Sequence, residues 1–177
     1  MIVTELTPEE CREALAKTGF GRIACARGNQ PYIVPIFFAV EDDYLYSFSS
    51  GGRKIDWMRD NPLVCLEVDS VTSWEDWTSV VAFGRYEELP DTPDWQTERQ
   101  RAHGLLQQRP MWWQPASVVT LDHAGEVFLP VFFRVILVHL TGHRAVSGSD
   151  GARPVAPDEQ ARGGWLRELF RPSNTEH

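Results

Sequence analysis

The stretch from Tyr44 to Met58 carries the residues of this chain best suited to hold a ligand. Its pattern predicts a strand, a turn rich in serine and glycine, and the start of a helix. Backbone N–H groups at a helix N-terminus attract anions, and glycines allow close approach of a ligand. Ser49, Arg53 and Lys54 add a hydroxyl and two cations, a donor set typical of a phosphate site. The alternative is a solvated turn, because serine, glycine and lysine are ordinary turn residues.

Three other segments carry groups that could contact a ligand. Thr78 and Ser79 begin a predicted strand, where their hydroxyls could donate to a phosphate or a ring; strand-forming residues are also ordinary there. Pro35 interrupts a strand pattern, so that strand is expected at a sheet edge or at a bulge beside a planar ligand. Trp112 lies in an aromatic loop and could stack on a flat ring, fill a subunit interface or pack in the core.

The sequence predicts neither a catalytic residue nor a metal site. No general base lies close in sequence to the serines and lysine of the turn. His139 and His143 would stand roughly 13 Å apart on a strand, too far to share a metal ion. The three cysteines form no CxxC pair, which indicates a reducing compartment and no zinc motif.

The composition is that of one globular domain. The chain has 177 residues, of which 42% are hydrophobic, and a formal net charge of −8. That charge argues against a nucleic-acid partner, since phosphate backbones favour basic surfaces. The N-terminus has no signal-peptide pattern, and the apolar stretch around residues 127–140 is too short and polar to span a membrane. We therefore expect a soluble, cytoplasmic protein.

The pattern along the chain predicts a mainly β fold. Thr7, Pro8 and Glu10 form a capping box that opens a helix, and Gly19 ends it. Residues 70–76 read as a polar loop. The remaining expected elements are strands over residues 21–26, 32–40, 44–48, 64–68, 77–89 and 127–142, and helices over residues 54–59 and 94–108.

Short connections between these elements favour antiparallel pairing. The 32–40 strand is apolar on both faces and is expected to be covered on both. Six antiparallel strands most simply close into a small β-barrel with short flanking helices. We expect this domain to span residues 1–144. Residues 145–177 read as a linker-like tail, with a short amphipathic helix near residues 164–170 or a disordered end.

Together these segments resemble the pyridoxamine 5′-phosphate oxidase-related family of flavin-nucleotide-binding split β-barrels, and within it the nitroimidazole-resistance subgroup. The resemblance covers about residues 5–144. Phe48 stands where that subgroup often has a histidine, which weakens any transfer of nitroreductase activity. The matching segments are residues 19–24, 30–38, 45–49, 52–62, 77–89, 112–116 and 133–135.

The resemblance implies a homodimer with FMN at the subunit interface. The turn would meet the flavin phosphate, and the strand with Pro35 would border the ring. The implied cofactor-binding residues are Val34, Pro35, Ile36, Phe37, Ser47, Phe48, Ser49, Arg53, Lys54, Thr78, Ser79 and Trp112.

The function expected from this resemblance is that of an FMN-dependent oxidoreductase acting on a small molecule. A flavin carrier without turnover is an alternative, as is a deazaflavin- or haem-binding relative on the same barrel. Oxidation of pyridoxamine phosphate is disfavoured, because the tail lacks an arginine-rich C-terminal substrate motif.

Overall fold

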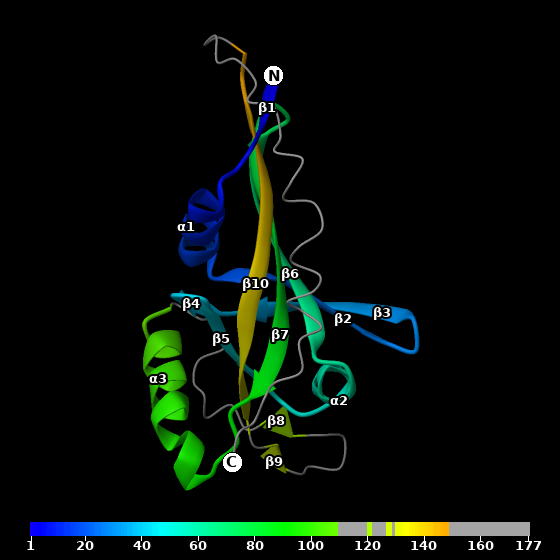
Figure 1. The fold of residues 1–177 in the computed structure, drawn as a ribbon, viewed down its shortest axis with the longest axis vertical. Helices are drawn as coiled ribbons and strands as arrows, with labels where there is room; N and C mark the ends of the chain where they lie inside the picture. Colours follow the sequence, from blue (N-terminus) through cyan, green and yellow to red (C-terminus); the bar gives the residue numbers. More distant parts are fainter. Residues whose placement is uncertain (110–119, 122–126, 129, 149–177) are drawn as a thin grey trace.

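The structure is a computed structural model that describes residues 1–109, 120–121, 127–128 and 130–148 (Figure 1). The described part is mainly β, with three α-helices and one short 3-10 helix. The elements are β1 Ile2–Glu5, α1 Pro8–Thr18, β2 Phe20–Arg27, β3 Gln30–Phe37, β4 Ala39–Glu41, β5 Tyr44–Ser49, α2 Arg53–Asp60, β6 Leu63–Ser73, β7 Asp76–Glu88, η1 Pro93–Trp95, α3 Gln96–Gln107, β8 Thr120–Leu121, β9 Val127–Phe128 and β10 Val131–Val146.

Eight of the strands form one antiparallel sheet. Its order is β3-β2-β6-β7-β10-β5-β4, with β1 added to the far end of β10. The end strands β3 and β4 do not pair with each other in the described part of the chain, so the sheet is not closed. The predicted antiparallel split-barrel class is confirmed, although the sheet has more strands than the six expected.

The first helix forms as its sequence predicts. The Thr7 side chain accepts a hydrogen bond from the Glu10 backbone N–H, and the Glu10 carboxylate accepts one from the Thr7 backbone. Gly19 ends the helix in the left-handed conformation, with φ of 64°. Cys11 and Leu15 are its buried residues and face the long strands.

The expected 32–40 strand is divided in two at Phe38. The buried Phe38 donates its backbone N–H to the Gly19 carbonyl oxygen at 2.9 Å, which takes it out of the strand ladder. β4 then forms the predicted hairpin with β5, whereas β3 pairs with β2. Pro35 lies on an edge strand, as predicted. The prediction that both faces of this strand are covered was wrong for a single chain, because the Ile33 side chain is 59% exposed.

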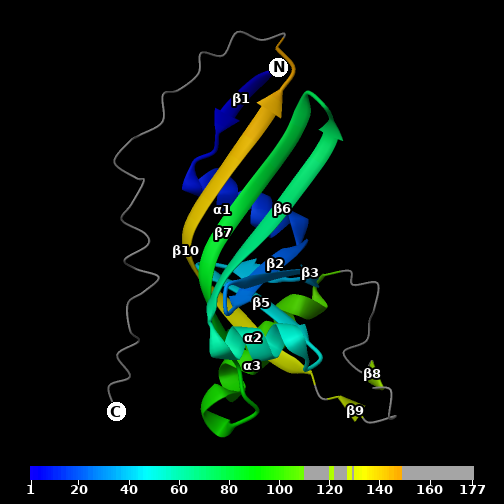
Figure 2. The same ribbon diagram turned by 90° about the vertical axis from the view of Figure 1, so that its right-hand side faces the viewer.

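The expected polar loop over residues 70–76 is instead the end of a long β-ribbon. β6 continues to Ser73, β7 begins at Asp76, and Trp74 and Glu75 form the turn between them. The Glu75 backbone N–H donates to the Ser73 hydroxyl at 3.2 Å. Pairing across the ribbon outweighs the weak strand propensity of its serines and aspartates. Figure 2 shows this ribbon reaching the opposite end of the molecule from α2.

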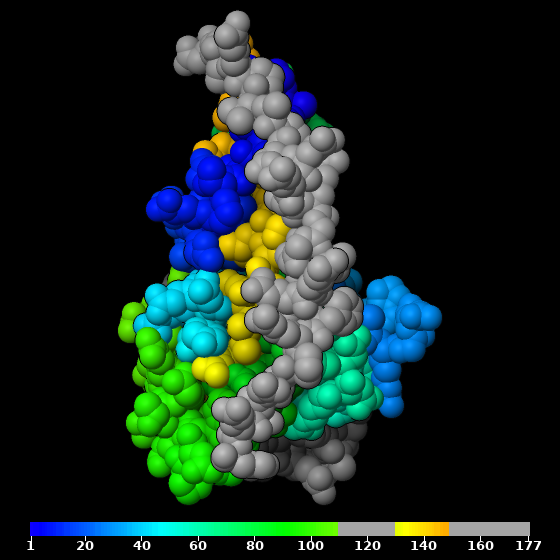
Figure 3. Space-filling view, in the orientation of Figure 1, coloured from blue at the N-terminus to red at the C-terminus, as the bar shows by residue number. Residues whose placement is uncertain are grey.

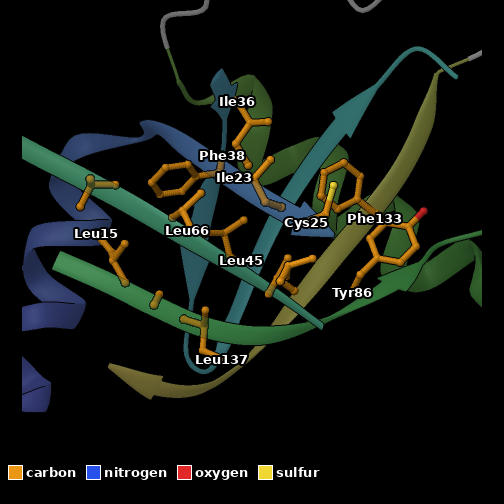
Figure 4. Packing of buried hydrophobic residues seen from close by; sticks show 14 of the residues in the cluster. Leu15, Ile23, Cys25, Ile36, Phe38, Leu45, Leu66, Tyr86, Phe133 and Leu137 are labelled. Carbon is orange, nitrogen blue, oxygen red and sulfur yellow. The ribbon is translucent and has the colours of Figure 1, made fainter. Parts of the chain in front are cut away.

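The core lies where the sheet curls around its own inner face. Ile23, Leu45, Leu66, Phe133 and Val135 are almost completely buried there, and Figure 4 shows most of this cluster. A second, smaller cluster lies under α3 and includes Tyr46, Leu89 and Phe132. The β2–β3 hairpin projects from the body at the side that carries α2 (Figures 1 and 3).

Candidate functional site

The turn between β5 and α2 has features that an anion site requires. α2 begins at Arg53 with no side chain capping its first N–H groups. Gly52 has φ of 139°, a conformation that favours glycine. No heavy atom lies within 4 Å of a Cβ built on Gly51 or Gly52, so both backbones stand in open space. A phosphate can therefore approach the free N–H groups and the positive end of the helix dipole.

The two cations of this turn have no carboxylate partner among the described residues. Arg53 lies over the Tyr32 ring, 5.6 Å from its centroid, and Lys54 makes no ion pair. Burial lowers the pKa of the Lys54 ammonium group, and the nearby Cys25 opposes the shift. The arginines that do pair with described carboxylates are Arg12, Arg22, Arg27, Arg59, Arg99, Arg101, Arg134 and Arg144. Two cations without a carboxylate partner on one helical turn form an arrangement that can bind an anion.

The other end of α2 is held firmly to the sheet. The Arg59 guanidinium donates to both oxygens of Glu88 on β7, at 2.7 and 2.8 Å. The Tyr86 hydroxyl donates to the same carboxylate at 3.0 Å. Arg59 holds the pKa of Glu88 below its ordinary value, and burial raises the pKa of Tyr86. Together with the buried Ile55 and Met58, these bonds fix the position of the turn.

The three predicted site residues of β5 face different surroundings. Ser47 is completely buried, and its hydroxyl donates to the Phe37 carbonyl oxygen at 2.7 Å. Phe48 packs on Phe132 under α3, with ring centroids 5.5 Å apart. Ser49 is half-buried, and its hydroxyl donates to the Ser50 carbonyl oxygen at 2.9 Å. Of the three side chains, only that of Ser49 lies at the turn itself.

The predicted ring-binding segment lies on the edge strand β3. Val34 and Phe37 are half-buried, Pro35 is exposed and Ile36 is buried. β3 pairs with β2 on one side only in the described part of the chain, so its other edge is open to a ligand. The Arg53–Tyr32 contact places this strand beside the turn.

Thr78 and Ser79 lie far from the turn within one chain. Ser49 pairs with Val131 on β10, and Ser79 pairs with His143, so about 40 Å of strand separates them. The two side chains also point to opposite faces of the sheet, because neighbouring strand residues alternate. Thr78 lines a cavity of about 430 Å³ beneath α1.

Ser79 lies on the other face, in a polar cluster. Its hydroxyl is 3.5 Å from the Glu67 carboxylate, which also pairs with Arg22. Arg22 pairs with Asp69 as well, at 2.7 Å. One copy of the chain therefore brings together Ser49, Arg53, Lys54 and β3, but not Ser79.

Trp112 lies outside the described residues. Tyr32 and Trp57 are aromatic neighbours of the turn that sequence reasoning missed, with ring centroids 5.5 Å apart. Trp57 follows Arg53 by four positions on α2, a helical spacing that could have indicated the shared side. No group of potential metal ligands occurs in the described ranges, and none of the described helices is long and apolar enough to cross a membrane.

Comparison with known proteins identifies the family. The sequence pattern of the pyridoxamine 5′-phosphate oxidase family matches residues 7–144. The chain belongs to the pyridoxamine 5′-phosphate oxidase family. The match covers every element from α1 to most of β10, including the turn and α2.

Individual relatives of this family agree with the fold. An uncharacterized protein of Rhizobium meliloti is 41% identical over 149 residues, covering 84% of this chain and 99% of that protein. A crystal structure of a FAD-binding protein from Mesorhizobium loti is 39% identical, with a TM-score of 0.69, and covers 82% of this chain and 99% of that one. A Bacteroides thetaiotaomicron protein assigned to 5-nitroimidazole antibiotic resistance shares the fold at 18% identity, with a TM-score of 0.59 and coverage of 81% and 89%. Of these three proteins, the one from Mesorhizobium loti is described as FAD-binding.

Proposed function

We propose that this protein is an FMN-binding flavoprotein whose phosphate site is the turn before α2. The observation that carries the proposal is that Arg53 and Lys54, on the uncapped first turn of that helix, have no carboxylate partner among the described residues. A flavin phosphate would supply the negative charge and the acceptor oxygens to which these two cationic side chains can donate. Ser49 adds a hydroxyl at the same turn, and the open edge of β3 at Val34–Phe37 borders the flavin ring.

We further propose a homodimer with the cofactor between the two copies. The support is the distance between Ser79 and the turn, which about 40 Å of strand separates within one chain. A second copy can bring its own Ser79 to the flavin held by the first. Neighbouring side chains of a strand face opposite ways. Ser79, on the side away from α1, would therefore contact the flavin, whereas Thr78 lines the cavity beneath α1.

A bound flavin would supply redox chemistry, so the proposed activity is that of an oxidoreductase acting on a small molecule. The protein's own part is to bind and orient the cofactor through the turn and β3. A flavin carrier without turnover is the competing function. It is favoured by the lack of a His, Asp or Glu partner for Lys54 or Ser49 among the described contacts.

FAD is the competing cofactor. The Mesorhizobium loti relative is a FAD-binding protein, and FAD carries a phosphate next to its flavin as FMN does. The open space around Gly51 and Gly52 leaves room for a second phosphate. Titration of the purified protein with FMN and with FAD, followed by flavin fluorescence, separates the two.

The absorbance spectrum of the purified full-length protein tests the proposed function. Flavin bands, with or without added FMN, would support it. A colourless protein that does not bind added FMN would refute it, and a Soret band would indicate haem instead. Anaerobic reduction by NADPH followed by rapid reoxidation with an electron acceptor would support an oxidoreductase, whereas slow reoxidation that no acceptor accelerates would favour the carrier.

A further inference from the structure

A cavity at α3 has no part in the proposed flavin site. Its volume is about 340 Å³, within the range of small-molecule sites. We call it the α3 cavity, because five of its lining residues come from one side of that helix at helical spacing: Gln96, Arg99, Gln100, His103 and Gly104. The buried Phe132 of β10 lies opposite them and completes the lining together with Asp91.

The α3 cavity is close to the turn before α2 but lies on another face of the sheet. α3 lies beside β5 and β10 (Figure 1). Phe132 follows Val131, whose partner on β5 is Ser49 of the turn. Phe132 and its partner Phe48 face α3, whereas Ser49 and Val131 face the opposite way because strand side chains alternate. A ligand in the cavity is therefore near the turn without using its cations.

A guanidinium and an aromatic ring form one wall of the cavity. Arg99 lies over the Phe132 ring, 4.9 Å from its centroid. It is held there by a hydrogen bond of 2.8 Å to the Leu89 carbonyl oxygen and by the Asp91 carboxylate at 3.6 Å. The His103 ring is 6.2 Å from the same phenyl ring. Nucleic-acid bases stack on both aromatic rings and guanidinium planes, so this wall suits a planar heterocycle.

Gly104 leaves the cavity side of α3 without a side chain at its middle. Glycine within a helix costs about 1 kcal/mol relative to alanine. No described heavy atom lies within 4 Å of a Cβ built at Gly104, so contacts within the described residues do not require a glycine there. Close approach of a ligand to the helix backbone would account for it.

Two carboxamides stand on the same side of the helix. Gln96 and Gln100 are one helical turn apart, and neither side chain hydrogen-bonds another described residue. A carboxamide carries one acceptor and two donors, which match the N6 and N7 positions of adenine. The wall and the carboxamides together select a purine base over an aliphatic ligand of the same volume.

We propose that the α3 cavity binds a purine nucleotide, with the base beside Gly104 against the Arg99–Phe132 wall and its edge bonded to Gln96 or Gln100. The proposal goes beyond the flavin site and does not depend on it. Two sources share this chemistry, a separate adenine nucleotide and the adenosine half of FAD.

Gly104→Leu tests the site in the full-length protein. Leucine favours a helix more than glycine, and its side chain would enter the open space, so the variant should fold and fill the cavity. The probe is labelled AMP, followed by equilibrium dialysis with saturating FMN present to occupy the turn before α2. The wild type should bind one AMP per chain, and Gly104→Leu should bind it at least tenfold more weakly.

A second helix position provides the matched control. Thr97 is exposed on α3 and does not line the cavity, so Thr97→Leu should bind AMP as the wild type does. Urea unfolding of both variants confirms that they are folded. CMP should bind the wild type at least tenfold more weakly than AMP, because cytosine lacks the N6 and N7 edge of adenine.

FAD identifies the source of the nucleotide. If the adenosine half of FAD occupies the cavity, FAD should displace AMP, and Gly104→Leu should weaken FAD binding but not FMN binding. If the nucleotide is a separate molecule, AMP should also bind the FAD-loaded protein. Unchanged affinities for both AMP and FAD in Gly104→Leu, or no saturable binding of either by the wild type, would overturn the proposal. AMP binding at the cavity without any flavin binding would refute the proposed function and leave this proposal intact.

Discussion

Replacement of Lys54 by methionine separates the ligand-binding role of this side chain from any structural role. Methionine keeps a long apolar stem and removes the charge. Lys54 is half-buried, and within the described residues it makes no ion pair or hydrogen bond. Its removal should therefore not weaken the empty protein. Because burial lowers the pKa of this ammonium group, its charge opposes folding at neutral pH, and the free energy of unfolding should rise in the variant.

Flavin binding should respond in the opposite direction. A hydrogen bond to a charged group contributes about 1.5–3 kcal/mol, so Lys54→Met should raise the FMN dissociation constant about 10- to 150-fold. Affinity is measured by quenching of flavin fluorescence, and stability by urea unfolding of the cofactor-free protein. Lys17, the other lysine of the chain, is exposed on α1 and provides the matched control, Lys17→Met. Unchanged FMN affinity in Lys54→Met, or a loss comparable to that in Lys17→Met, would refute the reasoning.

Three further substitutions test how the turn is held in place. Ser47→Ala should lower the free energy of unfolding by about 1 kcal/mol, because the completely buried Ser47 hydroxyl no longer donates to the Phe37 carbonyl oxygen; unaltered urea unfolding would contradict this. Glu88→Gln should cost about 1 kcal/mol at pH 7, since Arg59 is half exposed. The folded-state pKa of Glu88 lies below the unfolded value, so the contribution is present above about pH 4.5 and is lost as the pH falls. In urea unfolding, the difference in free energy of unfolding between wild type and Glu88→Gln should therefore be smaller at pH 3.5 than at pH 7. An equal difference at both pH values would argue against the Arg59–Glu88 pair. Thr7→Ala should cost about 1 kcal/mol by breaking the capping box of α1, and Thr7→Ser should restore most of it.

The local elements of this fold were largely predictable from the sequence. Thr7, Glu10 and Gly19 carry standard helix-end signals, and the structure confirms them. The helix after the turn was also predicted, because Gly51 and Gly52 precede it and Pro62 follows it. Such signals act over a few residues, so one sequence is enough to read them.

The predictions that were wrong concern features that depend on contacts between residues distant in sequence. The division of the 32–40 strand at Phe38 follows from a hydrogen bond to Gly19, and nothing next to Phe38 indicates it. The ribbon over residues 70–76 forms because β6 and β7 support each other, against the propensity of its polar residues. The sequence pattern also could not show that the Ser47 hydroxyl donates to the Phe37 carbonyl oxygen, or that Phe48 packs under α3.

The candidate site divides in the same way. Ser49, Arg53 and Lys54 are neighbours in sequence, and the structure keeps them on one turn beside β3. Ser79 was grouped with them through the family resemblance, yet within one chain it lies at the far end of the long strands. The proposed homodimer would reconcile the two positions by bringing Ser79 of a second copy to the site.

The ratio of the dissociation constants for FMN and riboflavin tests the central claim most directly. The two ligands share the flavin ring and differ in the phosphate. If Arg53 and Lys54 grip that phosphate, FMN should bind about a hundredfold tighter than riboflavin, the effect of two charge-assisted contacts. Equal affinities for the two ligands would show that the turn before α2 does not bind the cofactor phosphate, and would contradict the account.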